Sequence, residues 1–159
     1  MKRLRLRKKE AKRIAEEIKE NFEVCISGEI ERVTVDDRSV LLVDGEPVLL
    51  EYDSRHYFTV YGIIKFRPEK GMVIVDEGAV RFVMNGADIM KPGIVEADES
   101  IEEGDFCHVV VEKKLTPLAV GIALVSGKDM VGGKGKAVKN IHHLNDRIWK
   151  FFFVKKSKN

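Results

Sequence analysis

The chain has 159 residues, and its 28 basic and 26 acidic residues leave a formal net charge of +2. A hydrophobic content of 44% excludes a wholly disordered chain, and no apolar run approaches the roughly 18 residues that a membrane-spanning helix needs. The first leucines lie among Arg and Lys, so we expect no signal peptide, and two distant cysteines fit a reducing, cytoplasmic compartment. The sequence has no glutamine and 34% charged residues, and this composition favours a thermophilic source organism.

The near-neutral total hides an uneven distribution of charge. Residues 1–21 contain nine Lys or Arg against four acids, residues 147–159 contain five against none, and the stretch between them contains 14 against 22. Basic ends around an acidic middle are typical of a chain that binds a polyanion such as nucleic acid. Composition alone leaves an equal alternative, in which the basic ends are simply solvated.

The first half of the chain combines one helix with strands. Residues 7–21 have the apolar spacing of an amphipathic helix, although its basic residues cluster in the first half, where the helix dipole favours acids. Strand-like segments follow at 23–26, 30–35, 40–43 and 48–50, with Asp44-Gly45 suited to a type I′ hairpin turn. Residues 57–66 are ambiguous, because this aromatic and β-branched segment contains Gly62. The polar segment 67–71 is a candidate domain boundary.

The second half is richer in strands. Asp76 is placed to cap a helix over 77–84, and Gly86 to end it in a left-handed conformation. Residues 89–94 predict a strand on which Ile89 and Met90 alternate, so that Met90 points outward if Ile89 points inward. Further strands are predicted at 72–75, 106–112, 118–125 and 136–144, before a hydrophobic terminus at 148–154. The pattern indicates a small closed or half-closed barrel, and an α+β fold for the whole chain.

Catalytic and metal-binding patterns are missing from the sequence. The four histidines are scattered, and the paired carboxylates lie in apparent turns without a histidine or a nucleophile nearby. The glycine-rich run 132–136 lacks the spacing of a nucleotide-binding phosphate loop. It remains either a flexible loop whose Lys134 and Lys136 contact a phosphate backbone, or a plain solvated turn. We therefore expect no enzyme activity, no cofactor and no metal.

Residues 75–94 resemble the start of a PUA domain, the RNA-binding domain shared by pseudouridine synthases and archaeosine transglycosylases. The resemblance lies in a helix ending in Gly86-Ala87 and a strand ending in Pro92-Gly93-Ile94, and it continues at 103–105 and 117–121. Residues 133–149 are similar to the end of the malignant-T-cell-amplified-sequence family. In that family a PUA domain follows an N-terminal α+β pre-PUA domain, and its archaeal members share this layout.

The resemblance implies a domain layout and a fold. It implies a pre-PUA domain at 1–70, a PUA-type β-barrel with short helices at 71–154, and a basic tail at 155–159. It also implies a helix at 58–66, where residue propensities favour a strand.

The resemblance further implies RNA binding along the helix, the following strand and the loop between them. The matching residues, together with two lysines of the glycine-rich loop, are Arg81, Gly86, Ala87, Asp88, Met90, Lys91, Pro92, Gly93, Lys134 and Lys136. The expected partner is rRNA or tRNA in translation initiation or recycling, with the small ribosomal subunit and a density-regulated-protein-like factor as further partners, and no membrane. The alternative is an RNA-binding accessory subunit of an rRNA or tRNA modification enzyme.

Overall fold

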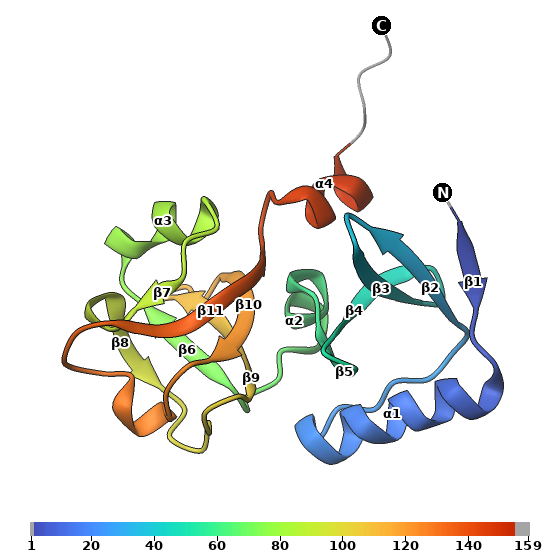
Figure 1. Cartoon of the computed structure of the whole chain (residues 1–159), viewed down its shortest axis with the longest axis horizontal. Helices are drawn as coiled ribbons and strands as arrows, with labels where there is room; N and C mark the ends of the chain where they lie inside the picture. The colour runs from blue at the N-terminus through green and yellow to red at the C-terminus, as the bar shows by residue number, and fades with distance from the viewer. Residues whose placement is uncertain (1, 155–159) are drawn as a thin grey trace, which may run out of the picture. The chain divides into compact units, whose positions relative to one another are not determined.

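The structure is a computed structural model that describes residues 2–154 (Figure 1). The basic tail predicted at 155–159 therefore lies outside the described residues. The chain divides into two compact units, Met1–Pro68 and Glu69–Asn159. Within residues 2–154, none of the helices combines the length and apolar content needed to cross a membrane.

The N-terminal unit contains one antiparallel sheet whose strands are paired in chain order, with two helices. Its elements are β1 (Arg3–Arg5), α1 (Lys8–Phe22), β2 (Ile30–Val35), β3 (Arg38–Val43), β4 (Glu46–Tyr52), β5 (Arg55–Phe58) and α2 (Val60–Phe66). The predicted hairpin turn is confirmed, because Asp44 and Gly45 have φ angles of 49° and 85°, as a type I′ turn requires. The predicted first helix is confirmed as α1, which buries Ile14 and Ile18.

One prediction in this unit is wrong, and the structure resolves one ambiguous segment. The segment 23–26 is not a strand: Glu23 adopts a left-handed conformation that ends α1, and β1 takes the place beside β2 instead. The ambiguous segment 57–66 contains both structures, since Tyr57 and Phe58 belong to β5 and α2 begins at Val60. Thr59 separates them, because its hydroxyl accepts a hydrogen bond from the Gly62 N–H (3.0 Å) and caps α2.

The C-terminal unit is a six-stranded sheet with short helices. Its elements are β6 (Met72–Val75), η1 (Glu77–Ala79), α3 (Val80–Met84), β7 (Ile89–Met90), η2 (Lys91–Gly93), β8 (Ile94–Ala97), β9 (Phe106–Val111), β10 (Pro117–Ala123), η3 (Gly127–Asp129), β11 (Lys136–His143) and α4 (Arg147–Phe153). The strand order is β7-β11-β10-β9-β6-β8. Since only the three residues of η2 join the two edge strands β7 and β8, the sheet must curl until its edges approach each other. The predicted barrel-like α+β fold is thereby confirmed.

The strand predicted at 89–94 is interrupted. Met90 ends β7, the turn η2 follows at Lys91–Gly93, and a separate strand β8 begins at Ile94. Pro92 has no N–H to donate to a ladder, so it lies in the turn rather than in a strand. The predicted alternation is confirmed, since Ile89 is 2% exposed and Met90 is 44% exposed.

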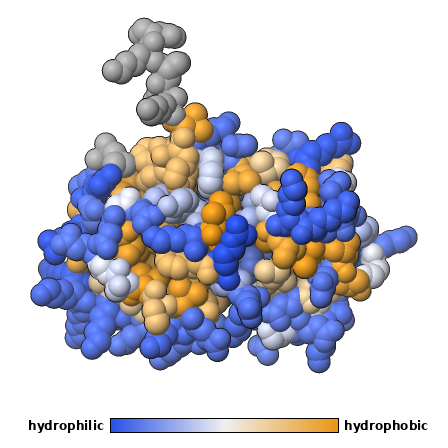
Figure 2. Space-filling view, turned by 180° about the vertical axis from the view of Figure 1, so that it is seen from behind, coloured by the Kyte–Doolittle hydropathy of each residue, from blue (hydrophilic) through white to orange (hydrophobic). Residues whose placement is uncertain are grey.

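The hydrophobic terminus is the helix α4, and Asp146 holds its start. One Asp146 oxygen accepts from the Trp149 N–H (2.9 Å), and the other lies 2.7 Å from His142 Nδ1. Burial opposes the charged form of Asp146, but the hydrogen bond with His142 and the N–H donors outweigh it and lower its pKa. Two aromatic side chains of α4 remain exposed, since Phe151 and Phe153 are 44% and 41% exposed. Figure 2 shows orange hydrophobic side chains among the blue hydrophilic ones on one face of the molecule.

Candidate nucleic-acid interface

A groove of about 630 Å³ runs between α3 and β7 in the C-terminal unit. Its walls are mostly apolar, with two acids and one lysine among them. The residues that line it are Asp76, Gly78, Ala79, Phe82, Val83, Ala87, Asp88, Ile89, Met90, Pro92, Gly93 and Lys136. Phe82 and Met90 are 55% and 44% exposed, so the groove offers large apolar surfaces to solvent. Such surfaces suit stacking against a flat ring such as a nucleobase.

Local backbone geometry places the two walls. Asp76 accepts a hydrogen bond from the Ala79 N–H (3.0 Å), which starts the helical segment directly after β6. Gly86 ends it with a φ of 90°, and the Ala87 N–H bonds back to the Phe82 carbonyl (3.0 Å). A side chain on Gly86 would be strained at that φ and would lie against the His143 ring. The chain therefore turns sharply from α3 into β7.

A charged pair lies on the β7 side of the groove. Lys136 Nζ lies 3.1 Å from an Asp88 carboxylate oxygen, and the other oxygen accepts from the Asn140 N–H (3.0 Å). Burial opposes the charged form of Asp88, but these two contacts outweigh it and hold its pKa below the usual value. Lys136 remains 61% exposed, so its ammonium group can also reach an anion in the groove.

Asn140 of β11 fixes the loop between α3 and β7. Its side-chain amide donates to the carbonyl oxygens of Val83 (3.1 Å) and Ala87 (3.0 Å). These bonds join α3 and Ala87, which precedes β7, to the strand β11. The groove is thus preformed by hydrogen bonds that do not require a ligand.

The structure brings most of the predicted site residues together. Those that line the groove are Ala87, Asp88, Met90, Pro92, Gly93 and Lys136. The pairing of β11 with β7 places Lys136 directly opposite Met90, although 46 positions separate them in the sequence. The glycine-rich loop lies beside η2, because the Lys91 N–H donates to the Gly135 carbonyl oxygen (2.9 Å).

Four predicted residues lie outside the groove lining. They are Arg81, Gly86, Lys91 and Lys134. The Arg81 guanidinium lies 5.1 Å from the centre of the Phe82 ring, so it borders the groove through that side chain. Lys134 is exposed in the glycine-rich loop, and Lys91 is half-buried at the start of η2.

The sequence reasoning missed Phe82 and Asn140. Phe82 lies on the solvent side of a short helix, and its exposed ring in a groove wall follows only from the helix orientation. Asn140 could not be singled out from the sequence, because its strand β11 also contains Lys139 and His142. Within residues 2–154, no three or more His, Cys, Asp or Glu side chains gather in a way that could hold a metal ion.

Comparisons with known proteins agree with this architecture. Residues 71–144 match the PUA domain, and residues 2–66 match a domain of unknown function, DUF1947. The chain is therefore a PUA-domain protein.

The full-length relatives define the family more narrowly. An uncharacterised protein of Methanocaldococcus jannaschii is 44% identical over 156 residues, covering 94% of this chain and 96% of that protein. Translation machinery-associated protein 20 of Schizosaccharomyces pombe is 30% identical, covering 77% and 71% of the two chains. The crystal structure of a hypothetical protein from Pyrococcus horikoshii superimposes with a TM-score of 0.85 at 38% identity, covering 95% and 99%. The chain belongs to the family that includes translation machinery-associated protein 20 and the malignant-T-cell-amplified-sequence proteins.

Proposed function

We propose that this protein binds RNA through the groove between α3 and β7 and acts in translation, in contact with rRNA or tRNA. The observation that carries the proposal is the preformed apolar groove with Lys136 at its edge, in the part of the chain that matches the PUA domain. Unpaired bases bind proteins by stacking on apolar and aromatic side chains, while lysines contact phosphates. Phe82, Met90 and Lys136 supply both kinds of contact.

The role in translation rests on the relatives. One of them, 30% identical, is named translation machinery-associated protein 20, and a second is named eukaryotic translation initiation factor 2D. By this kinship we extend the proposal to a partnership with the small ribosomal subunit and with a density-regulated-protein-like factor. The same kinship supports a non-enzymatic role, since these names refer to translation and not to a reaction.

The RNA itself is identified by crosslinking in cells, followed by sequencing of the bound fragments. The proposal predicts enrichment of rRNA or tRNA sequences over the total RNA background. Fragments distributed like the background would contradict it. A parallel pull-down with and without ribonuclease separates RNA-mediated partners from direct protein partners.

The groove is tested with the double variant Phe82→Ala, Met90→Ala. Both side chains are largely exposed, so their removal takes away stacking surface while the melting temperature changes little. We expect RNA affinity to fall by about tenfold or more, at roughly 1–3 kcal/mol for each stacked base. The control is Val95→Ala, which truncates an apolar side chain that is also 44% exposed but lies outside the groove lining. Equal affinities for the groove variant and the control would exclude the groove as the RNA site.

A further inference from the structure

The N-terminal unit carries a dense group of cations far from the groove in the sequence. Residues 2–13 contain eight Lys or Arg and a single acid, Glu10, and all eight cations are exposed. Two of them, on β1, form ion pairs: Arg5 lies 2.8 Å from Glu29, which precedes β2, and Arg3 lies 3.8 Å from Glu31 of β2. The other six form no ion pair with any carboxylate of residues 2–154: Lys2, Arg7, Lys8, Lys9, Lys12 and Arg13.

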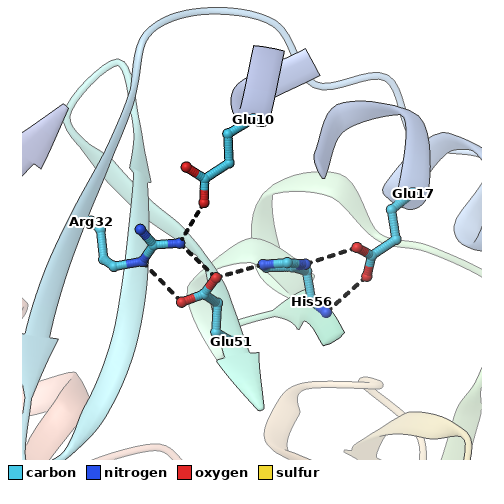
Figure 3. Close-up of polar contacts among 5 residues, drawn as sticks. All are labelled: Glu10, Glu17, Arg32, Glu51 and His56. Carbon is cyan, nitrogen blue, oxygen red and sulfur yellow. Dashed lines mark hydrogen bonds and ion pairs between the residues drawn. The ribbon is translucent and has the colours of Figure 1, made fainter. Parts of the chain in front are cut away.

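The one acid in this stretch points inward. Figure 3 shows Glu10 directed at Arg32 of β2, with a distance of 3.0 Å between Glu10 Oε1 and Arg32 Nη2. Arg32 also binds both oxygens of Glu51 (2.9 and 2.8 Å), so Glu10 joins a network on the sheet. The Glu10 carboxylate is therefore engaged by Arg32 rather than by the neighbouring lysines of α1.

A second contact holds α1 farther along the helix, at Glu17. Glu17 accepts from the His56 backbone N–H and contacts His56 Nδ1, both at 2.8 Å, while His56 Nε2 contacts Glu51 at 2.8 Å (Figure 3). Together with buried Ile14 and Ile18, these contacts determine which side of α1 faces the sheet. The first two turns of α1 consequently present their cations to solvent.

The position of these cations is unfavourable for folding. Lys8–Lys12 and Lys9–Arg13 are like-charge pairs four residues apart, and Lys8 and Lys9 lie in the first turn, at the positive end of the helix dipole. Arg7, at the N-cap, makes no side-chain hydrogen bond to the helix. Charges that break local rules without compensation in the folded chain are expected where they serve a function.

We propose that Arg7, Lys8, Lys9, Lys12 and Arg13, named here the α1 cationic face, form a second RNA-binding surface that contacts the phosphate backbone. The proposal takes RNA as the partner from the proposed function, but it concerns a separate surface. Residues 2–13 contain no aromatic side chain, so this surface has no aromatic ring on which bases could stack. Its contribution is therefore sequence-independent and electrostatic, whereas the groove contacts bases.

The test uses the full chain with Lys8→Glu and Lys9→Glu combined, and a fluorescein-labelled RNA hairpin with a single-stranded extension. By fluorescence anisotropy we expect about fivefold to tenfold weaker binding, and a salt dependence whose slope falls by about 1 for each phosphate that the variant no longer neutralises. The same variant should melt at a higher temperature, because acids in the first turn suit the helix dipole and two like-charge pairs disappear. Weaker RNA binding by a variant that is more stable than wild type cannot be caused by unfolding, so it would show the loss of a contact with RNA.

The matched control is Lys113→Glu with Lys114→Glu, which makes the same change in net charge in the exposed turn after β9. If both double variants weakened RNA binding equally, the effect would come from net charge alone, and the proposal would be overturned. Unchanged RNA affinity of the variant with Lys8→Glu and Lys9→Glu would overturn it as well. If only the double variant Phe82→Ala, Met90→Ala weakens RNA binding, the result supports the proposed function and contradicts the second RNA-binding surface. Binding to phosphatidylserine vesicles but not to the hairpin, abolished by Lys8→Glu and Lys9→Glu, would assign the surface to lipid and overturn it.

Discussion

At the level of single residues, His108 is a buried titratable group that gives the C-terminal unit a defined pH dependence. It lies on β9 with 1% exposure, and burial lowers its pKa from about 6.5 to about 4, with the negative charge of Asp98 opposing this in part. Between these two values the unfolded chain binds a proton that the folded chain does not. The free energy of unfolding must therefore fall as the pH falls through this window.

We predict that His108→Leu removes this dependence. In wild type the pH drop from about 7 to about 4.5 should cost on the order of 2–3 kcal/mol through His108, at about 1.4 kcal/mol for each pH unit. Denaturant unfolding of both proteins across that range measures the difference. The carboxyls with lowered pKa lose their stabilising effect mainly below their ordinary values, 3.8 for Asp98 and Asp146 and 4.5 for Glu51, and they do so in both proteins alike. If the free energy of unfolding fell equally with pH in the two proteins, His108 would not be the source of the pH dependence.

Among the elements, α2 shows how packing overrides residue propensity. Gly62 lies inside this helix, where an alanine would favour the helical backbone by about 1 kcal/mol. A Cβ atom on Gly62, however, would overlap the carbonyl oxygen of Val48 in β4. Val48 O also accepts the Thr59 N–H (3.0 Å), so this carbonyl is held in place and cannot move aside. The glycine allows α2 to approach the sheet closely.

Gly62→Ala is therefore expected to destabilise the N-terminal unit despite the better helix propensity. Overpacking against a fixed backbone atom costs about 1–3 kcal/mol, which outweighs the gain in propensity. A fall in the midpoint of thermal or guanidinium unfolding measures the effect. Gly78→Ala is the control, because its Cβ would meet only the Asp76 carboxylate at 3.4 Å. A Gly62→Ala protein as stable as wild type would show that α2 can shift away from β4.

For the whole molecule, the charge distribution predicts how RNA binding responds to salt. An acidic middle section of 14 basic and 22 acidic residues disfavours RNA in general, so binding depends on local cations such as Lys136 and the α1 cationic face. Each phosphate that these cations neutralise releases counterions.

We expect RNA affinity to fall by about two orders of magnitude or more between about 50 and 200 mM salt, as for several phosphate contacts. The measurement is a gel-shift or anisotropy titration at several salt concentrations, with circular dichroism as the check that the fold itself is unchanged. Affinity that does not vary with salt would contradict a phosphate-contacting role for either surface.

Much of this fold could be predicted from short-range patterns. The apolar spacing of α1, the Asp44-Gly45 turn, the Asp76 cap and the alternation of Ile89 and Met90 each depend on neighbours within a few residues. Segments whose burial comes from distant partners were harder: residues 23–26 alternate like a strand but pair with none, and β1 pairs although all its side chains are exposed. Whether a segment pairs as a strand depends on the neighbouring strands in the folded sheet, and a local sequence pattern does not contain that information.

The sequence by itself determined the domain type, the basic ends and the residues of the loop at Gly86 and Pro92, because these are properties of composition and local motif. Only the tertiary structure decided that Lys136 meets Asp88 and that Phe82 faces the groove. It alone showed that Asn140 joins the two walls and that Glu10 turns toward Arg32. The physical reason is that hydrogen bonds and ion pairs between residues far apart in the chain form only after the strands have paired and placed them within about 3 Å of each other.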